Sequence, residues 1–167
     1  YGVAHKAFLQ EAESLSKLAM TPTAEHLMRV FFLRERLKKL AKKKTVIFQF
    51  VHVIGAGTMG GDIAAWCALQ GLNVTLQDRN AKCLAPAMTR AYALFQKRLK
   101  TPRAIQAAMD RLLPDLAGYG IRRADIIIEA VFEDLTIKRD LFRQLENQAK
   151  PDALLATNTS SLVLEAI

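Results

Sequence analysis

One short segment, Gly55-Ala56-Gly57-Thr58-Met59-Gly60, constrains the fold of this 167-residue chain more than any other. It is a GxGxxG motif that directly follows a nearly continuous apolar run, Thr45 to Ile54, and opens a stretch of helical character. Such a run is typical of a parallel strand buried on both faces. In this context the first glycine allows a tight turn, the second lets the backbone approach a diphosphate, and the third lets helix and strand pack closely. The motif therefore predicts a strand, an anion-binding turn and a helix, in that order.

A second strand and an acidic residue complete this unit. The predicted helix, residues 58–70, ends at Gly71, and the second strand, residues 73–77, ends at Asp78. Asp78 lies 18 residues beyond Gly60, where a carboxylate can accept hydrogen bonds from the ribose hydroxyls of a dinucleotide and repel a 2′-phosphate. Arg79 weakens that discrimination, so NAD is favoured over NADP but the choice stays open. FAD and S-adenosylmethionine sites share parts of the pattern and remain alternatives.

The rest of the chain continues the alternation of apolar strands and amphipathic helices. Thr101-Pro102 is a helix-start signal and Pro114 a stop signal. The predicted elements are helices over 81–100 and 102–113, a strand over 125–130, a helix around 135–149, a strand over 153–157 and the start of a helix over 162–167. This order predicts an α/β fold, a Rossmann-type, doubly wound, mostly parallel sheet with a helical insertion.

Residues 1–44 are predicted to be a helical leader, and residues 45–167 the dinucleotide-binding domain. Thr21-Pro22 predicts the start of a second helix. Apolar residues then recur at steps of three and four, and they form a stripe that must pack on another surface: Leu27, Val30, Leu33, Leu37 and Leu40. The lysines at 42–44 mark the expected boundary.

Charge and cysteine content exclude several classes of protein. Residues 34–44 hold seven basic residues and one acid, which accounts for most of the net charge of +8, so a charged helix face is favoured over a nucleic-acid site. Cys67 and Cys83 form no CxxC pair, which argues against a disulfide framework and a metal site and favours a reducing, cytoplasmic setting. The chain has no apolar run long enough to span a bilayer, so we expect no membrane insertion.

Three segments in register resemble the NAD-binding domain of L-3-hydroxyacyl-CoA dehydrogenases. They are Val53–Ala64 around the glycine motif, Glu129-Ala130-Val131-Phe132-Glu133-Asp134, and Asn158-Thr159-Ser160-Ser161-Leu162. The helical insertion fits that family too. Residues 31–38 resemble the linker of multifunctional fatty-acid oxidation proteins, in which an enoyl-CoA hydratase domain precedes the dehydrogenase. The resemblance implies that residues 1–44 are the end of such an upstream module.

The resemblance also implies roles for individual residues. Ser160 would position the substrate, and Lys138 and Ser160 align with positions that contact cofactor or substrate. The implied cofactor-binding set is Gly55, Gly57, Thr58, Met59, Gly60, Asp78, Val131, Phe132, Glu133, Lys138, Asn158 and Ser160. From the residues alone, Ser160 and Ser161 could instead cap the next helix, and Asp134 is better explained by a helix start. Basic residues of the insertion could meet coenzyme A or simply face water: Lys97, Arg98, Lys100 and Arg103.

The general base of the expected reaction is not found in this sequence. In the family a His–Glu pair that follows the Asn-Thr-Ser-Ser segment takes the hydroxyl proton, whereas His5, His26 and His52 are poor candidates. The resemblance therefore implies a parent enzyme that oxidises L-3-hydroxyacyl-CoA in fatty-acid β-oxidation, as a homodimer or within a larger complex. This chain, truncated before the helical second domain, is expected to bind NAD without turnover. Another β-hydroxyacid-type dehydrogenase and a non-catalytic dinucleotide sensor are the alternatives.

Overall fold

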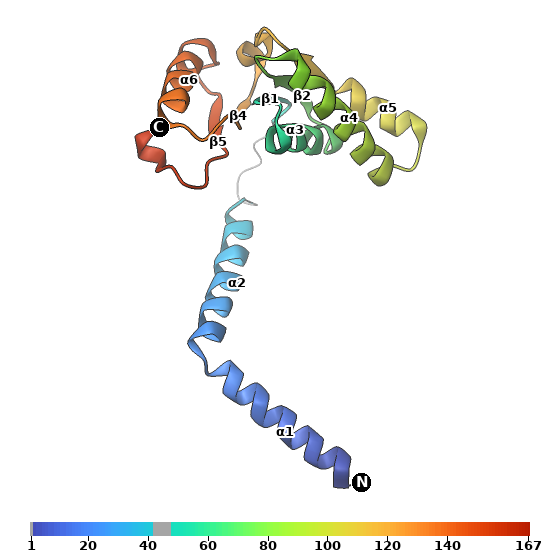
Figure 1. The fold of residues 1–167 in the computed structure, drawn as a ribbon, viewed down its shortest axis with the longest axis vertical. Helices are drawn as coiled ribbons and strands as arrows, with labels where there is room; N and C mark the ends of the chain where they lie inside the picture. Colours follow the sequence, from blue (N-terminus) through green and yellow to red (C-terminus); the bar gives the residue numbers. More distant parts are fainter. Residues whose placement is uncertain (1, 42–47) are drawn as a thin grey trace. The chain divides into compact units, whose positions relative to one another are not determined.

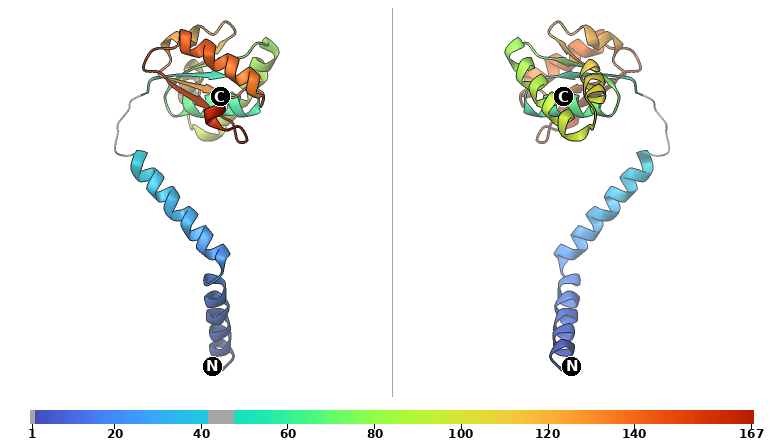
Figure 2. Two further views of the ribbon diagram at one scale, coloured as in Figure 1. Left: turned by 90° about the vertical axis from the view of Figure 1, so that its left-hand side faces the viewer. Right: turned by 90° about the vertical axis from the view of Figure 1, so that its right-hand side faces the viewer.

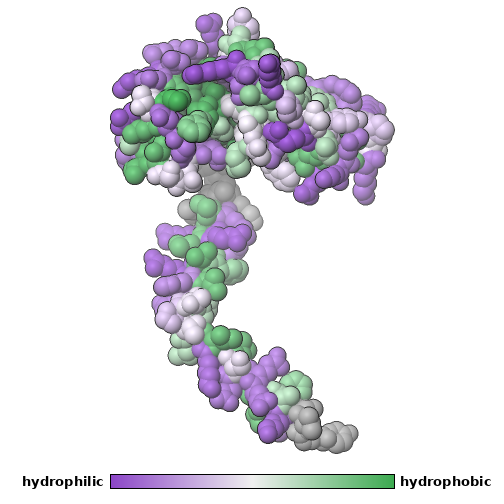
Figure 3. All heavy atoms as spheres, in the orientation of Figure 1, coloured by the Kyte–Doolittle hydropathy of each residue, from purple (hydrophilic) through white to green (hydrophobic). Residues whose placement is uncertain are grey.

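The computed structural model describes residues 2–41 and 48–167, which form two units. In the first unit, helices α1 (Gly2–Ala19) and α2 (Pro22–Ala41) are joined at Thr21, whose hydroxyl accepts a hydrogen bond from the Ala24 N–H at 3.2 Å. The predicted helix start is therefore confirmed. Apolar side chains lie at the surface of both helices (Figure 3). The predicted boundary at Lys42 to Lys44 lies outside the described residues.

The second unit is built on a five-stranded, all-parallel sheet in the order β3-β2-β1-β4-β5. The strands are β1 (Phe50–Ile54), β2 (Asn73–Gln77), β3 (Leu112–Asp115), β4 (Ile126–Glu129) and β5 (Leu154–Thr157). Figure 1 shows helices α3 (Thr58–Leu69), α4 (Ala81–Arg98) and α5 (Pro102–Asp110) on one side of the sheet and α6 (Leu135–Gln148) on the other, and the two views of Figure 2 agree. The prediction of a Rossmann-type α/β fold is confirmed.

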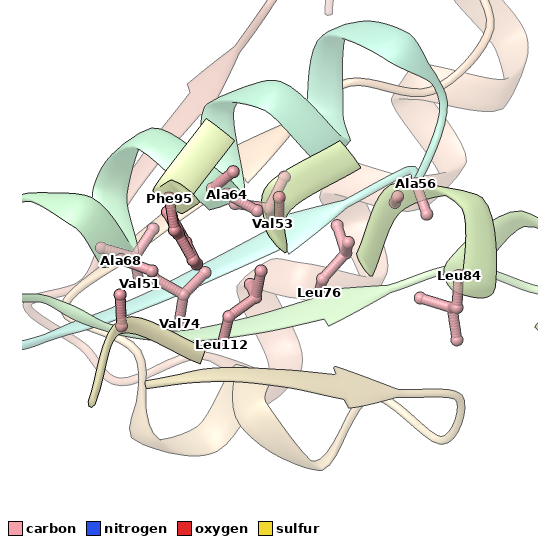
Figure 4. Close-up of a cluster of buried hydrophobic side chains, with 14 residues drawn as sticks. Val51, Val53, Ala56, Ala64, Ala68, Val74, Leu76, Leu84, Phe95 and Leu112 are labelled. Atoms are coloured by element: carbon pink, nitrogen blue, oxygen red, sulfur yellow. The ribbon is translucent and has the colours of Figure 1, made fainter. Parts of the chain in front are cut away.

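Successive side chains along each strand point to opposite faces of the sheet and so contribute to two separate apolar cores. Val51 and Val53 of β1 face α3 and α4, and join Val74, Leu76 and Phe95 in the larger core (Figure 4). The other face carries a smaller apolar cluster of Ile54, Ile121, Ala124, Ile127 and Leu145, where α6 and the short 3₁₀ helix η1 (Tyr119–Arg123) pack. Small alanines of α3 and α4 allow a close approach to the sheet.

Three sequence predictions of element boundaries were wrong. The helix predicted to reach Leu113 ends at Asp110, and Leu112–Asp115 form a strand that the sequence did not predict. The Arg111 carbonyl accepts a hydrogen bond from the Val74 N–H at 2.7 Å, so pairing with β2 takes over where the helix ends. Pro114 is tolerated because β3 is an edge strand.

The other two differences lie at the start and end of the domain. The first strand begins at Phe50, not at Thr45; residues 48–49 are not strand, and 45–47 lie outside the described residues. In place of the helix predicted over 162–167 there is one 3₁₀ turn, η2 (Leu164–Ala166). None of the helices in residues 2–41 and 48–167 is long and apolar enough to cross a membrane.

Candidate nucleotide-binding site

The predicted site residues gather at one edge of the sheet, because the carboxyl ends of parallel strands share an edge. Ile54, Gln77, Glu129 and Thr157, the last residues of β1, β2, β4 and β5, are paired across neighbouring strands. The segments that follow these strands contain all the predicted site residues except Lys138, which lies in α6. In open α/β sheets, ligands bind in the crevice outside this edge, where the strand order reverses.

The segment Gly55–Gly60, called the glycine loop below, owes its shape to two close backbone contacts. Gly55 has φ +103°, and a Cβ there would lie 2.5 Å from the carbonyl oxygen of Ala130. A Cβ on Gly60 would lie 1.9 Å from the carbonyl oxygen of Gly55. Any side chain at either position would push β1, α3 and the end of β4 apart. The tight turn and the close helix packing predicted for these two glycines are both present.

Gly57 differs from the other two glycines because its side-chain position is open. Apart from Gly57 itself and its two chain neighbours, no atom of the described residues lies within 4 Å of the place that its Cβ would occupy. Gly57 is the N-cap of α3, and Thr58 and Met59 in the first turn are exposed. The first N–H groups of a helix lack intrahelical partners and carry the positive end of the helix dipole. The loop therefore offers an uncovered cradle that fits a diphosphate.

Asp78 is bonded to the glycine loop from the end of β2. Its Oδ2 accepts a hydrogen bond from the Ala56 N–H at 2.8 Å, and its Oδ1 accepts one from the Asn80 N–H at 3.0 Å. The half-buried carboxylate thus fixes the loop and keeps lone pairs for a ribose hydroxyl. The sequence placed Asp78 at this edge but gave no sign of its bond to Ala56.

Arg90 of α4 is a neighbour of the loop that sequence patterns gave no reason to single out. Its Nη2 donates to the Gly57 carbonyl oxygen at 3.0 Å, and its Nε lies 3.5 Å from Asp62 Oδ1. A Cβ on Gly61 would lie 2.8 Å from this guanidinium. The absence of a side chain at Gly61 thus makes room for a cation beside the start of α3.

A group of polar side chains joins the ends of β4 and β5, and it is called the charged cluster below. Its members are Glu129, Glu133, Lys138, Thr157, Thr159 and Ser161. The side chains of Glu129 and Lys138 are both 0% exposed, and the Lys138 ammonium donates to both Glu129 carboxylate oxygens, at 2.7 and 2.8 Å. Glu129 also accepts hydrogen bonds from the Val131 N–H at 2.7 Å and from the Thr157 hydroxyl at 2.6 Å. The buried carboxylate is therefore fully satisfied.

Glu133 extends the charged cluster toward the segment after β5. One of its carboxylate oxygens lies 3.3 Å from the Lys138 ammonium. The other accepts hydrogen bonds from the Thr159 hydroxyl and, at 2.9 Å, from the Ser161 hydroxyl. The bonds from Thr159 and Ser161, assisted by Lys138, lower the pKa of Glu133 from its ordinary value of 4.5 to about 2. Glu133 is therefore a carboxylate at neutral pH.

Most of the predicted cofactor-binding residues are accessible at this edge. Met59, Phe132, Asn158 and Ser160 are exposed, and Val131 is half-buried. Lys138 is the exception, because its charged end is buried between the two glutamates. Ser160 and Ser161 do not cap a following helix, since η2 has Val163 at its N-cap. Asp134 caps α6 by accepting a hydrogen bond from the Ile137 N–H at 2.9 Å, in agreement with the helix-start interpretation.

Sequence patterns gave Glu129 no structural role, although one signal could have done so. Glu129 ends the strand Ile126-Ile127-Ile128-Glu129, and a charge at a position expected to be buried requires a partner. His52 is a buried strand residue, as predicted: its Nε2–H donates to Gln77 Oε1 at 2.9 Å, and Nδ1 accepts from the Thr75 hydroxyl at 2.7 Å. Burial lowers the pKa of His52, which favours the neutral ring.

Comparisons with known proteins identify the family to which this sequence is similar. A family model described as "3-hydroxyacyl-CoA dehydrogenase, NAD binding domain" matches residues 50–167. The fatty acid oxidation complex subunit alpha of Pseudomonas entomophila is 33% identical over 169 residues, which is 97% of this chain and 24% of that protein. The protein of the same name from Psychrobacter arcticus is 36% identical over 164 residues, 94% of this chain and 23% of its own length. The chain thus spans about a quarter of the length of these relatives.

Solved structures give the same result at the level of the fold. The crystal structure of 3-hydroxybutyryl-CoA dehydrogenase from Escherichia coli has a TM-score of 0.69 and 37% identity, and the match covers 72% of this chain and 26% of that one. The dehydrogenase part of multifunctional enzyme 1 from C. elegans has a TM-score of 0.65 and 30% identity, covering 72% of this chain and 28% of that one.

Proposed function

Because the chain belongs to the 3-hydroxyacyl-CoA dehydrogenase NAD-binding domain family, we propose that it provides the cofactor site of an enzyme that oxidises L-3-hydroxyacyl-CoA to 3-oxoacyl-CoA. NAD is the cofactor of this family, and bound NAD supplies the hydride acceptor. The observation that carries the proposal is the glycine loop, where two glycines are required by backbone contacts and the third is open to a ligand. The activity belongs to the whole protein, of which this chain is one part.

The glycine loop and Asp78 hold the adenosine diphosphate half of NAD. The N–H groups at the start of α3 donate to the diphosphate, and Gly57 lets it approach the backbone. Asp78, already bonded to Ala56, accepts hydrogen bonds from the adenosine ribose and disfavours a 2′-phosphate. Because the Asp78 carboxylate binds both the loop and the ribose, the conformation of the loop and the binding of the nucleotide depend on each other.

The segments after β4 and β5 hold the nicotinamide half and orient the substrate. Val131, Phe132 and Glu133 follow β4, and Asn158 and Ser160 follow β5, at the same edge as the glycine loop. The exposed Ser160 hydroxyl donates a hydrogen bond to a substrate oxygen beside the nicotinamide. That contact fixes the substrate carbon for hydride transfer, and a general base elsewhere in the whole protein takes the hydroxyl proton.

The relatives' names extend the proposal to partners. Those proteins are named as subunits of a fatty acid oxidation complex, so the whole protein is proposed to work in such a complex, on acyl-CoA substrates and as a dimer or larger assembly. Four basic side chains in and around α4 and α5 are exposed and able to meet coenzyme A phosphates: Lys97, Arg98, Lys100 and Arg103.

Binding of the reduced cofactors tests the proposal directly. We expect saturable NADH binding to this chain by fluorescence or calorimetry, tighter than NADPH binding. Asp78→Ala should weaken NADH about tenfold, the size expected when a charge-assisted hydrogen bond is lost. Asp152→Ala removes an exposed aspartate in the turn before β5 and should leave both affinities unchanged.

Three results would contradict the proposal. They are no binding of either nucleotide, equal binding of NADH and NADPH with no effect of Asp78→Ala, and equal losses in the two aspartate variants. For the whole protein, reduction of NAD that depends on an L-3-hydroxyacyl-CoA tests the activity, and its absence across short and long acyl chains would reject it.

A further inference from the structure

We propose that Arg90 of α4 is a positioning residue for the diphosphate of the nucleotide: it orients the peptide between Gly57 and Thr58, and it offsets the charge of Asp62. The proposal rests on the proposed function, because the diphosphate that it concerns is that of NAD. It adds a side chain from a second helix to a site that is otherwise built from backbone groups at the start of α3.

The contact between Arg90 and Gly57 joins α4 to the glycine loop. α4 packs beside α3 (Figure 1), and the Nη2 of Arg90 donates to the Gly57 carbonyl oxygen at 3.0 Å. The same oxygen accepts a hydrogen bond from the Gly61 N–H at 3.0 Å, as the N-cap carbonyl of a helix does. A carbonyl oxygen has two lone pairs, so both of its acceptor positions are used. The direction of this carbonyl is therefore fixed from two sides.

A fixed Gly57 carbonyl also fixes the Thr58 N–H, because the two groups belong to one planar peptide unit and point in opposite directions. Thr58 is the first residue of α3, where an N–H group has no partner within the helix. It is one of the donors that the proposed function assigns to the diphosphate. Arg90 thus orients a ligand-binding donor through the backbone, from the other end of the same peptide unit.

Asp62 gives Arg90 its second role. It lies four residues beyond Thr58, which is about 6 Å along the helix axis. A carboxylate at that distance repels an anion bound at the helix start, because the separation is shorter than the Debye length of about 8 Å at physiological salt. The Nε of Arg90 lies 3.5 Å from Asp62 Oδ1, so the guanidinium offsets this charge. The two side chains are 40% and 60% exposed, and we therefore expect a several-fold effect on affinity.

Arginine suits both contacts at once, and the neighbouring glycine leaves room for it. A guanidinium is planar and carries five N–H donors, so it can serve a carbonyl and a carboxylate together, whereas an ammonium is a compact point charge. A Cβ on Gly61 would lie 2.8 Å from the Nη2 of Arg90 and 3.0 Å from the Cβ of Ala87. A side chain at position 61 would therefore displace the guanidinium from the loop.

The test uses two ligands that share the diphosphate, NADH and ADP, the second of which lacks the nicotinamide half. At low salt, Arg90→Met should raise both dissociation constants by similar factors of about fivefold, the size expected for two unit charges about 6 Å apart in a medium close to water. The factor should shrink toward about 1 M salt, where the Debye length falls to about 3 Å and the electrostatic part of the loss is screened. Calorimetric titration at several salt concentrations measures it.

Two further variants separate the two roles. Asp62→Asn removes the repulsive charge, so in the Arg90→Met background it should tighten both ligands about twofold at low salt, and the loss that remains is that of the oriented Thr58 N–H. Arg90→Lys keeps the charge but not the planar fork, so it should cost about twofold with little dependence on salt. The matched control is Arg143→Met, because Arg143 pairs with Asp140 at 3.2 Å within α6. It should leave both affinities unchanged at every salt concentration.

The remaining outcomes overturn the proposal in recognisable ways. Unchanged affinities in Arg90→Met, or a loss confined to NADH, would reject it. A loss that neither salt nor Asp62→Asn relieves would mean that Arg90 only holds α4 against α3, and would reject it too. If the unsubstituted chain binds neither NADH nor ADP, the proposed function fails and this inference fails with it. If the unsubstituted chain binds both and Arg90→Met binds them equally well, only this inference fails.

Discussion

The glycine loop after β1 and the charged cluster after β4 and β5 both hold segments at the edge of the sheet in a fixed conformation. They do so by opposite means. The loop depends on close backbone packing that only glycine permits. At Gly55 and Gly60 a single added Cβ would lie 2.5 Å or less from a backbone oxygen. The cluster depends on ion pairs, in which one buried ammonium lies between two carboxylates. The first device fixes a backbone against other backbone, and the second fixes two segments through side chains. They should therefore fail differently when they are changed.

The largest expected effect is at Gly60. In Gly60→Ala the added Cβ would lie 1.9 Å from the Gly55 carbonyl oxygen, which belongs to the backbone and cannot rotate away. We expect the free energy of unfolding to fall by at least about 4 kcal/mol, at the upper end for single substitutions. Urea denaturation measures this loss, and a decrease below about 1 kcal/mol would show that the loop is not held by this contact.

Lys138→Met should rank second. Removal of one partner leaves the buried Glu129 carboxylate without its cation, which costs about 3 to 5 kcal/mol in buried pairs. Lys150→Met breaks an ion pair whose side chains are 34% and 25% exposed, and its cost should be about 1 kcal/mol or less. Urea denaturation of the two variants side by side checks the difference. Equal losses would mean that burial does not distinguish the two pairs.

These two devices also explain why the sequence predicted one part of the site better than the other. Glycine at Gly55 and Gly60 has few functions other than positive φ or close approach, so the motif between a strand and a helix predicts its own geometry. Lysine at 138 and glutamate at 133 fall in amphipathic sequence, where a charge ordinarily faces water. Only the pairing of β4 with β5 brings Thr157 and Glu129 together.

The fold likewise has features that the sequence predicted and features that it did not. Parallel pairing and the helical insertion were predicted from the alternation of apolar strands and helices, whereas the order of the strands was not predicted. The edge strand at Leu112–Asp115 was not predicted either, because Pro114 and Asp115 have low strand propensity and it is the pairing with β2 that holds the segment in the sheet. The short η2 turn likewise replaced a helix that local sequence favoured.

Asp78→Asn should have a moderate effect on both stability and binding. The substitution keeps an acceptor for the Ala56 N–H but removes the charge, which is expected to cost about 1 kcal/mol of stability. NADH and ADP should lose affinity by the same factor, because both ligands carry the adenosine ribose. Calorimetric titration with both ligands tests this. A loss confined to NADH would place Asp78 near the nicotinamide half of the cofactor and contradict its proposed contact with the adenosine ribose.

Acid should affect the charged cluster through Glu133. Because its pKa is lowered from 4.5 to about 2, its bonds stabilise the fold fully above pH 4.5, and this contribution is lost as the pH falls from 4.5 toward 2. The free energy of unfolding of Glu133→Gln should therefore fall less steeply over that range than that of the unsubstituted chain. Asp125, whose pKa is also lowered to about 2, titrates in both proteins and cancels in the difference. Parallel pH profiles would contradict the assignment.

We expect the smallest effect on stability at Gly57. Gly57→Ala should also separate ligand affinity from stability most clearly. Its φ of −61° suits alanine, and in the described part of the chain no atom beyond the two neighbouring residues lies within 4 Å of the new Cβ. A weaker N-cap and a less flexible unfolded chain act in opposite directions, so stability should change by about 0.5 kcal/mol or less. Affinity for NADH and ADP should nevertheless fall about tenfold, because the Cβ takes up space that the diphosphate needs. An unchanged affinity in this folded variant would mean that the diphosphate does not approach Gly57, and the glycine loop would then be a structural turn like any other.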